Sequence, residues 1–129
     1  MAQTSVWTIA LTKAHYDWAM TSRAERIGRN EALFREVNER IEDVTETLGN
    51  EPERLQLLCE CGSPSCTERI TLARNEYEAL RGDAQLFAVY PGHEDATVER
   101  VAERRNGYDV VRKHTGEPER IAEETDPRP

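Results

Sequence analysis

The sequence is poor in aromatic and apolar residues and has no long apolar run. Aromatic residues make up 6% and hydrophobic residues 37% of the 129 positions, whereas roughly 45–50% of an average globular chain is apolar when glycine is included. The longest apolar run is far shorter than the roughly 20 residues that a membrane-spanning helix needs. These shortages exclude a membrane span and predict one small core. A core of this size often needs additional stabilisation, for example by a bound metal.

Basic residues are outnumbered as well. The chain has 17 Lys and Arg against 25 Asp and Glu, which gives a net charge of −8. Non-specific binding to nucleic acid needs a dense basic surface, and the one basic cluster here is interleaved with acidic residues. This cluster consists of Arg100, Arg104, Arg105, Arg112 and Lys113. We interpret it as the solvated surface of a hairpin, so a nucleic-acid partner is not expected.

Cysteine is scarce, and its count of 3 is odd, which argues against a complete set of internal disulfides. The apolar stretch Ser5–Leu11 has no basic residue before it, and Lys13 follows it. Because this order is wrong for a secretory signal, we expect the protein to lie in the reducing cytoplasm. Clustered cysteines in that compartment more often bind metal than form disulfides.

The cysteines that are present form a compact motif. Cys59, Cys61 and Cys66 have the spacing C-x-C-x4-C, and the turn-forming residues Gly62 and Pro64 lie between the last two. Alternation along a strand places the first two sulfurs on one face, and the third returns across the turn. Because thiolates are preferred zinc ligands and four-coordinate structural sites commonly take three cysteines and one histidine, the motif predicts a structural zinc site.

The fourth ligand is expected to be His93, which follows a Pro-Gly turn at the end of a predicted strand. His114 is the alternative ligand, and His15 is the least favoured of the three histidines. Without a metal, His93 would be a turn histidine, and the cysteines would be buried thiols or would include a Cys59–Cys66 disulfide. We favour zinc over an iron–sulfur cluster because such clusters usually take four cysteines.

A long amphipathic helix is predicted within residues 23–49. Asn30 is placed as its N-cap and Gly49 as its C-cap. Apolar residues at intervals of three and four form a narrow strip on this helix. The strip consists of Phe34, Val37, Ile41, Val44 and Leu48. We expect it to cover the core of the same chain, and the alternative is a homodimer or protein-partner interface.

The predicted fold class is α+β. A long N-terminal helix precedes a small, mainly antiparallel sheet with a zinc-knuckle hairpin and one short helix, and residues 50–114 form the zinc-binding domain. The expected elements after the long helix are strands at 55–59 and 68–72, a helix at 74–81, a strand at 86–90 and a last hairpin. Asn106-Gly107 is a strong hairpin signal, although a helix beginning after Asp95 is the alternative for this segment.

The two ends of the chain are expected to lie outside this domain. Residues 1–22 are interpreted as an N-terminal extension, either a short amphipathic helix containing Trp7 and Trp18 or a segment preceding a translational start at Met20. Residues 115–129 are acidic and contain three prolines, so they are predicted to be disordered.

Several motifs resemble those of small, uncharacterised actinobacterial proteins. The likeness runs from about residue 30 to the tail and leaves out residues 1–19. It is carried by Asn30–Asn38, Cys59–Cys66, Ile70–Leu72, Glu76–Glu78 and Pro91–Asp95. The recurring cysteines and Gly-His pair imply a metal site that joins Cys59, Cys61 and Cys66 to His93. Ala73 departs from the hydroxyl residue expected before the short helix, and the resemblance implies no activity.

The functional expectation is a cytoplasmic, zinc-stabilised binding or regulatory module without enzymatic activity. One alternative is a redox or metal sensor that uses the thiolates as its switch. The other is a zinc-dependent hydrolase with Glu94 as general base. Three thiolates argue against the hydrolase, because their negative charge reduces the Lewis acidity of the metal.

Overall fold

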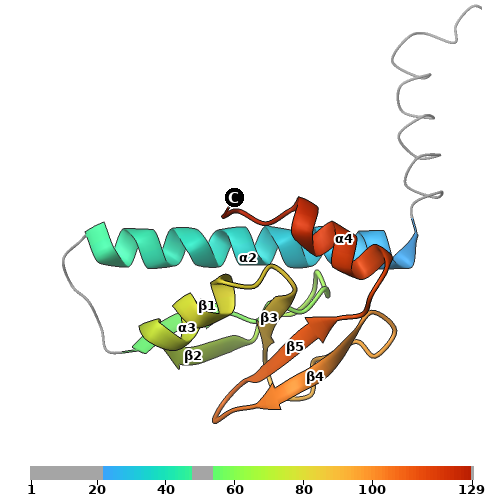
Figure 1. Cartoon of the computed structure of the whole chain (residues 1–129). Helices are drawn as coiled ribbons and strands as arrows, with labels where there is room; N and C mark the ends of the chain where they lie inside the picture. The colour runs from blue at the N-terminus through green and yellow to red at the C-terminus, as the bar shows by residue number, and fades with distance from the viewer. Residues whose placement is uncertain (1–21, 48–53, 129) are drawn as a thin grey trace, which may run out of the picture.

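The computed structural model describes residues 22–47 and 54–128, and these residues form three helices and five strands. In chain order they are α2 (Arg23–Thr47), β1 (Arg54–Leu58), β2 (Arg69–Ala73), α3 (Arg74–Arg81), β3 (Leu86–Val89), β4 (Glu99–Arg104), β5 (Asp109–Lys113) and α4 (Glu117–Glu124). The long helix, the antiparallel strands and the short helix confirm the predicted α+β class (Figure 1).

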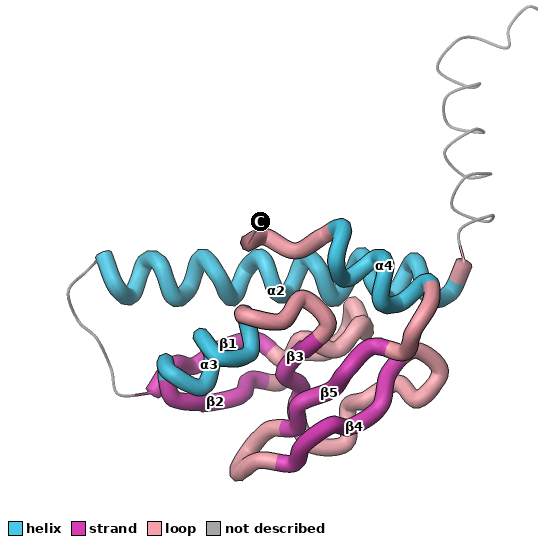
Figure 2. The backbone as a smooth tube through the Cα atoms, in the orientation of Figure 1, coloured by secondary structure: helices cyan, strands magenta, loops and turns pink. Residues whose placement is uncertain are grey.

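The described strands form two small antiparallel sheets, where the sequence predicted one. β1 and β2 make a hairpin, and β3, β5 and β4 make a three-stranded sheet in that order. Helix α2 lies across one side of both sheets (Figure 2). Apolar side chains of the strands, among them Leu57, Leu72 and Val111 with no exposed surface, fill the core.

The last hairpin has the turn that the sequence predicted. β4 and β5 pair in antiparallel register, and Gly107 in the turn has a φ of 92°, a left-handed conformation that favours glycine. The alternative of a helix beginning after Asp95 is wrong. Val98 and Val111 lie in the core, so the apolar residues of this segment serve the hairpin and the strands beside it.

Helix α3 also has its predicted bounds and inward face. Tyr77 and Leu80 are buried. The Glu76 carboxylate accepts a hydrogen bond of 2.8 Å from the backbone N–H of Ala73, which supplies half of a capping box. The helix therefore starts at Arg74 although Ala73 has no side-chain oxygen to cap it.

Helix α2 begins seven residues earlier than the predicted cap at Asn30. Ser22 is the actual N-cap, since its hydroxyl accepts a 3.0 Å hydrogen bond from the backbone N–H of Glu25. Gly28 does not end the helix because it serves packing instead: a Cβ at this position would lie 2.7 Å from Cγ2 of Ile121 in α4. The predicted C-cap, Gly49, lies outside the described residues.

The prediction of a disordered tail after residue 114 is wrong. Residues 117–124 form α4, and its apolar residues Ile121 and Ala122 are buried. Because Gly28 has no side chain, Ile121 of α4 can pack directly against α2. Arg35 of α2 also donates a 2.9 Å hydrogen bond to the backbone oxygen of Ala122. The acidic composition of the tail hid this small buried face.

The buried face of α2 is polar, contrary to the expectation that the apolar strip covers the core. Its buried residues are Gly28, Glu31, Arg35, Asn38 and Glu42. Most of the apolar strip is rotated away from this face, and of its residues Ile41 packs against the core. Phe34, Val37 and Ile41 are half-buried, Val44 is 58% exposed, and Leu48 lies outside the described residues.

The buried charged side chains of α2 pair with groups outside the helix, which offsets part of the cost of burying them. Glu31 pairs with Lys113 of β5, and Arg35 donates a 2.7 Å hydrogen bond to the backbone oxygen of Ala84. Glu42 pairs with Arg74 of α3 at 3.3 Å. Among residues 22–47 and 54–128, no helix is long and apolar enough to cross a membrane.

Candidate metal centre

The three cysteines lie in and beside the loop that joins β1 to β2. Cys59 directly follows β1, and its backbone N–H bonds at 3.1 Å to the oxygen of Glu68, the last residue of the loop before β2. The N–H of Cys66 bonds to the oxygen of Ser63 at 3.2 Å, which closes the tight turn. This hairpin therefore aims all three thiols at one place, as the spacing predicted.

His93 reaches the same place from the far end of β3. Gly92 has a φ of 87°, so the chain turns sharply before the histidine. The N–H of His93 bonds to the oxygen of Tyr90 at 2.9 Å, and the two rings contact each other with centroids 5.1 Å apart. Turn geometry and ring packing thus fix the imidazole beside the cysteines.

Cys59, Cys61, Cys66 and His93 form a potential metal-binding site. Their ligand atoms all lie within 4.8 Å of one another. His93 Nδ1 is 3.6 Å from the sulfur of Cys59 and 3.5 Å from that of Cys66. Zinc bonds of about 2.3 Å to sulfur and about 2.05 Å to nitrogen, held at tetrahedral angles, separate these atoms by about 3.5 Å. The two S···N distances therefore match the edges of a zinc tetrahedron.

The thiols of the cluster do not ionise equally. A hydrogen bond from Cys59 lowers the pKa of Cys61 to about 5. The pKa of Cys59 is raised because Cys59 donates this bond and is buried, and burial raises the pKa of Cys66. The cluster by itself thus readily holds one negative charge. A bound divalent cation would favour the thiolate at all three positions.

Glu60, between the first two candidate ligands, anchors the loop, a role that no sequence pattern indicated. Its side chain has no exposed surface. The carboxylate accepts hydrogen bonds from Arg81 at 3.1 Å, from the N–H of Ala88 at 3.0 Å and from Asn38 at 2.8 Å. α2, α3 and β3 therefore meet at the residue that separates Cys59 from Cys61.

Helix α2 holds the cysteine loop at two further points. The Asn38 side chain accepts a 2.9 Å bond from the N–H of Leu58 and donates a 3.0 Å bond to its oxygen. Nearer the helix N-terminus, the Asn30 amide donates to the oxygen of Gly62 at 3.1 Å. A Cβ on Gly62 would lie 2.4 Å from Cγ2 of Ile27, so only glycine allows this approach.

The structure separates the two described histidines. His93 belongs to the cluster, whereas Nε2 of His114 contacts the backbone oxygen of Ala96 at 3.0 Å and is not among the clustered ligand atoms. His15 lies outside the described residues. Of the predicted candidates for the fourth ligand, only His93 is placed beside the cysteines within residues 22–47 and 54–128.

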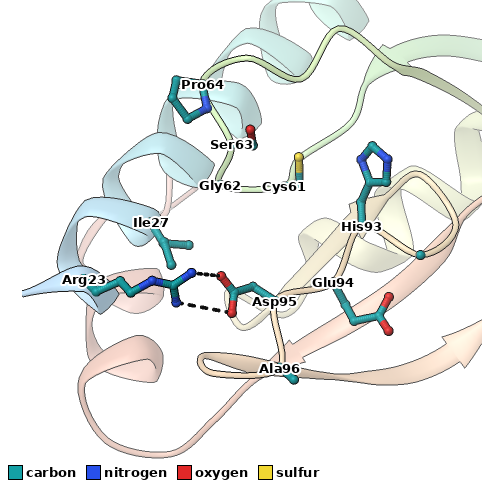
Figure 3. A pocket seen from close by; sticks show the side chains of 11 residues that line it. Arg23, Ile27, Cys61, Gly62, Ser63, Pro64, His93, Glu94, Asp95 and Ala96 are labelled. Atoms are coloured by element: carbon teal, nitrogen blue, oxygen red, sulfur yellow. Dashed lines mark hydrogen bonds and ion pairs between the residues drawn. The ribbon is translucent and has the colours of Figure 1, made fainter.

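An open pocket of about 620 Å³ adjoins the cluster, and Cys61 and His93 form part of its wall (Figure 3). Arg23 and Asp95 lie at its other end, joined by an ion pair of 3.0 Å. The Glu94 carboxylate points away from the Cys61 sulfur and the His93 ring (Figure 3). The pocket therefore gives small molecules access to one side of the cluster.

Comparisons with protein-family models, with curated proteins and with solved structures found no match to this chain. The resemblance to actinobacterial proteins accordingly stays a prediction from the sequence.

Proposed function

We propose that this protein is a zinc-stabilised binding or regulatory module of the cytoplasm, in which the metal has a structural role. The observation that carries the proposal is the convergence of three sulfurs and one imidazole nitrogen, from two separate segments, within 4.8 Å. All three cysteines are free thiols. A reducing compartment would keep them in the form that binds metal.

The donor set supports zinc as the metal. Three thiolates and one imidazole make a common four-coordinate zinc shell. Iron–sulfur clusters usually take four cysteines, and carboxylate-preferring metals such as magnesium and calcium would not select these donors. The S···N distances of 3.5 and 3.6 Å further favour a single ion bound directly by the four side chains.

A structural role is supported by the number of protein ligands. Four side chains complete a tetrahedral shell, whereas catalytic zinc sites keep one position for water or substrate. Glu94, the candidate general base of a hydrolase, is directed away from the cluster (Figure 3). The hydrolase alternative therefore has less support than a closed site.

The test is metal analysis of the reduced, untagged protein. We expect one zinc per chain in the native protein, loss of zinc in Cys66→Ser and weakened binding in His93→Ala. His114→Ala is the matched control and should keep full zinc content, because His114 lies outside the cluster. Cobalt substitution with a tetrahedral absorption spectrum would support the closed shell. A folded native protein without metal would overturn the proposal.

A second candidate function, a thiol-based redox sensor, is favoured by the exposure of the cluster. Cys66 and His93 are only half-buried, and Cys61 lines the pocket. Hydrogen peroxide that enters there can take two electrons from two thiolates and, with two protons, form one disulfide and two molecules of water. The remaining cysteine and histidine are too few to retain zinc, so the metal would leave.

Mild peroxide distinguishes the two candidates. A sensor should release zinc to a chromogenic chelator and take it up again after a thiol reductant is added. A purely structural site should keep its metal under the same treatment. Cys66→Ser cannot serve here because it already lacks a ligand, so the native protein with and without reductant provides the comparison.

A further inference from the structure

The outer side of α2 bears apolar side chains that project from the molecule. Leu33 and Val44 are 56% and 58% exposed, and they are two of the three exposed large hydrophobic residues in the described part of the chain. Half-buried Val37 lies between them. Because positions 33, 37 and 44 are four and seven residues apart, their side chains share one side of the helix. We name these three residues the outer strip.

The outer strip faces away from the elements that pack on α2. The face of Gly28, Glu31 and Asn38 is the one that meets α4 and the β-sheets. Ile41, at one flank of the strip, already packs against the core. An apolar row on the far side of a helix that is otherwise well packed indicates contact with another molecule.

We propose that two copies of this chain associate by packing their α2 helices antiparallel along the outer strip. The strip ends in one apolar residue on each side, Leu33 and Val44. A two-fold axis near residues 38 and 39 therefore places Leu33 of each copy opposite Val44 of the other. A self-complementary surface of this kind is the one that a closed symmetric dimer requires.

The charges beside the outer strip complement themselves under the same axis. Glu36 and Arg40 flank the strip with exposed side-chain fractions of 58% and 79%, and their contact within one chain is a loose 3.9 Å. In the antiparallel pair, Arg40 of each copy lies about opposite Glu36 of the second copy. Two intermolecular ion pairs can thus form at the rim and favour this orientation over a parallel one.

The size of the strip sets the expected strength. Eleven steps along the helix from Leu33 to Val44 span about 17 Å. Two single helices that meet along this length bury less than the roughly 800 Å² per partner of a standard interface, so association in the micromolar range is expected. This inference goes beyond the zinc site and does not depend on it.

Sedimentation velocity of the full, zinc-loaded chain tests the proposal. Between about 5 and 200 μM, a range that brackets micromolar affinity, we expect the native protein to pass from monomer to dimer. Leu33→Glu and Val44→Glu should each weaken association at least about tenfold, without loss of zinc or of the helical circular dichroism signal. Ala102→Glu, at an exposed position on β4, is the matched control and should associate like the native protein.

A mixed pair tests the register. Leu33→Lys and Val44→Glu should each associate poorly alone, whereas a mixture should form the heterodimer, because the new lysine then meets the new glutamate and the second contact stays native. Native mass spectrometry separates the species by mass. A native protein that stays monomeric throughout the range, or variants that associate as well as it does, would overturn the proposal. Association without heterodimer rescue would overturn the antiparallel register.

Discussion

A buried carboxylate lies between the first two candidate metal ligands. Glu60 accepts hydrogen bonds from Arg81, Asn38 and the N–H of Ala88, and both it and Arg81 have almost no exposed surface. Removing such a carboxylate altogether would leave the buried guanidinium without its counter-charge, which typically costs 3–5 kcal/mol. The loop that presents Cys59 and Cys61 is therefore fixed from behind by charge and hydrogen bonds.

Glu60→Gln should loosen the metal site without removing a ligand. The amide keeps one acceptor oxygen but turns an NH₂ group toward donors, so the loop loses part of its anchorage. We expect zinc affinity to fall about 10- to 100-fold, the usual effect of changing a group that orients metal ligands. Competition with a chromophoric chelator measures it. Glu68→Gln, at an exposed position of the same loop, is the control, and equal losses in both variants would contradict the role given to Glu60.

A second buried charge cluster lies under the N-terminal half of α2. Lys113 pairs with both Glu31 and Glu99, the latter at 2.6 Å. Burial raises the pKa of Glu31 well above its ordinary value of 4.5, and the nearby Glu99 raises it further, although Lys113 opposes the shift. The folded protein thus binds a proton on Glu31 more tightly than the unfolded chain does.

This proton makes stability fall as the pH rises. Above pH 4.5 the unfolded chain releases the Glu31 proton while the folded protein keeps it, so each rise in pH favours unfolding until the folded pKa is passed. Glu31→Gln should remove this fall, because the amide does not titrate. Urea unfolding of the zinc-saturated protein from pH 5 to 8 measures it. Glu36→Gln, at an exposed site, should leave the native pH profile unchanged; a Glu31→Gln profile parallel to the native one would contradict the argument.

At the scale of elements, α2 and α4 meet through a glycine. The would-be Cβ at Gly28 lies 2.7 Å from Cγ2 of Ile121, which is closer than two carbons can pack. Because Ile121 is buried and branched at Cβ, it cannot swing aside freely. The contact therefore depends on the absence of a side chain near the N-terminal end of α2.

Gly28→Ala is expected to destabilise the protein by about 1–3 kcal/mol through overpacking, partly offset by about 1 kcal/mol of helix propensity. The double variant Gly28→Ala with Ile121→Ala should show a smaller loss than the sum of the single changes, since the second change removes the clashing atom. Urea unfolding gives the four free energies of the cycle. Additive losses would mean that α4 is not held against Gly28.

The elements that the sequence predicted well have local signals. The Asn106-Gly107 turn, the α3 helix and the alternation through Leu55 and Leu57 are decided by neighbouring residues. The buried face of α2 could not be found in this way, because Glu31 and Lys113 are 82 positions apart and each is polar. α4 was missed for the same reason: Gly28, which makes room for it, lies far away in the sequence.

The candidate ligands could also be predicted only where their signals are local. Three closely spaced cysteines are a recognisable metal-binding pattern, and the Pro-Gly turn indicates that His93 can reach them. Glu60, Asn38 and Arg81 carry no such signal, because their pairing exists only once three separate elements have come together. Sequence patterns therefore indicated the candidate metal donors but not the groups that hold those side chains in place.

At the scale of the whole molecule, metal binding and folding should be one equilibrium. Cys59 and Cys61 belong to the core cluster that includes Phe87 and Val111, so the site is part of the packed interior. Structural zinc contributes roughly 10–16 kcal/mol in zinc-finger peptides, comparable with the stability of an entire domain. A core this poor in aromatic residues has little else to replace that contribution.

Removal of zinc by a chelator should therefore lower the thermal midpoint by more than about 10 °C, given that 1 kcal/mol shifts a domain of this size by several degrees. Circular dichroism during heating measures it. Zinc added back in excess of chelator is the control and should restore the midpoint. An unchanged midpoint in verified metal-free protein would show that the fold stands without the ion.

Asn38 of α2 forms hydrogen bonds with both the N–H and the backbone oxygen of Leu58, and this pair of bonds restrains the helix. A helix that packs on its sheets through apolar side chains alone can shift along its axis or rotate about it, since apolar contacts have no preferred direction. Displacing α2 by one turn would present Phe34 or Glu42 to the backbone of Leu58, and neither can donate and accept there at once. The Asn38 amide therefore sets both the axial position and the rotation of α2, and so determines which side of the helix faces the solvent.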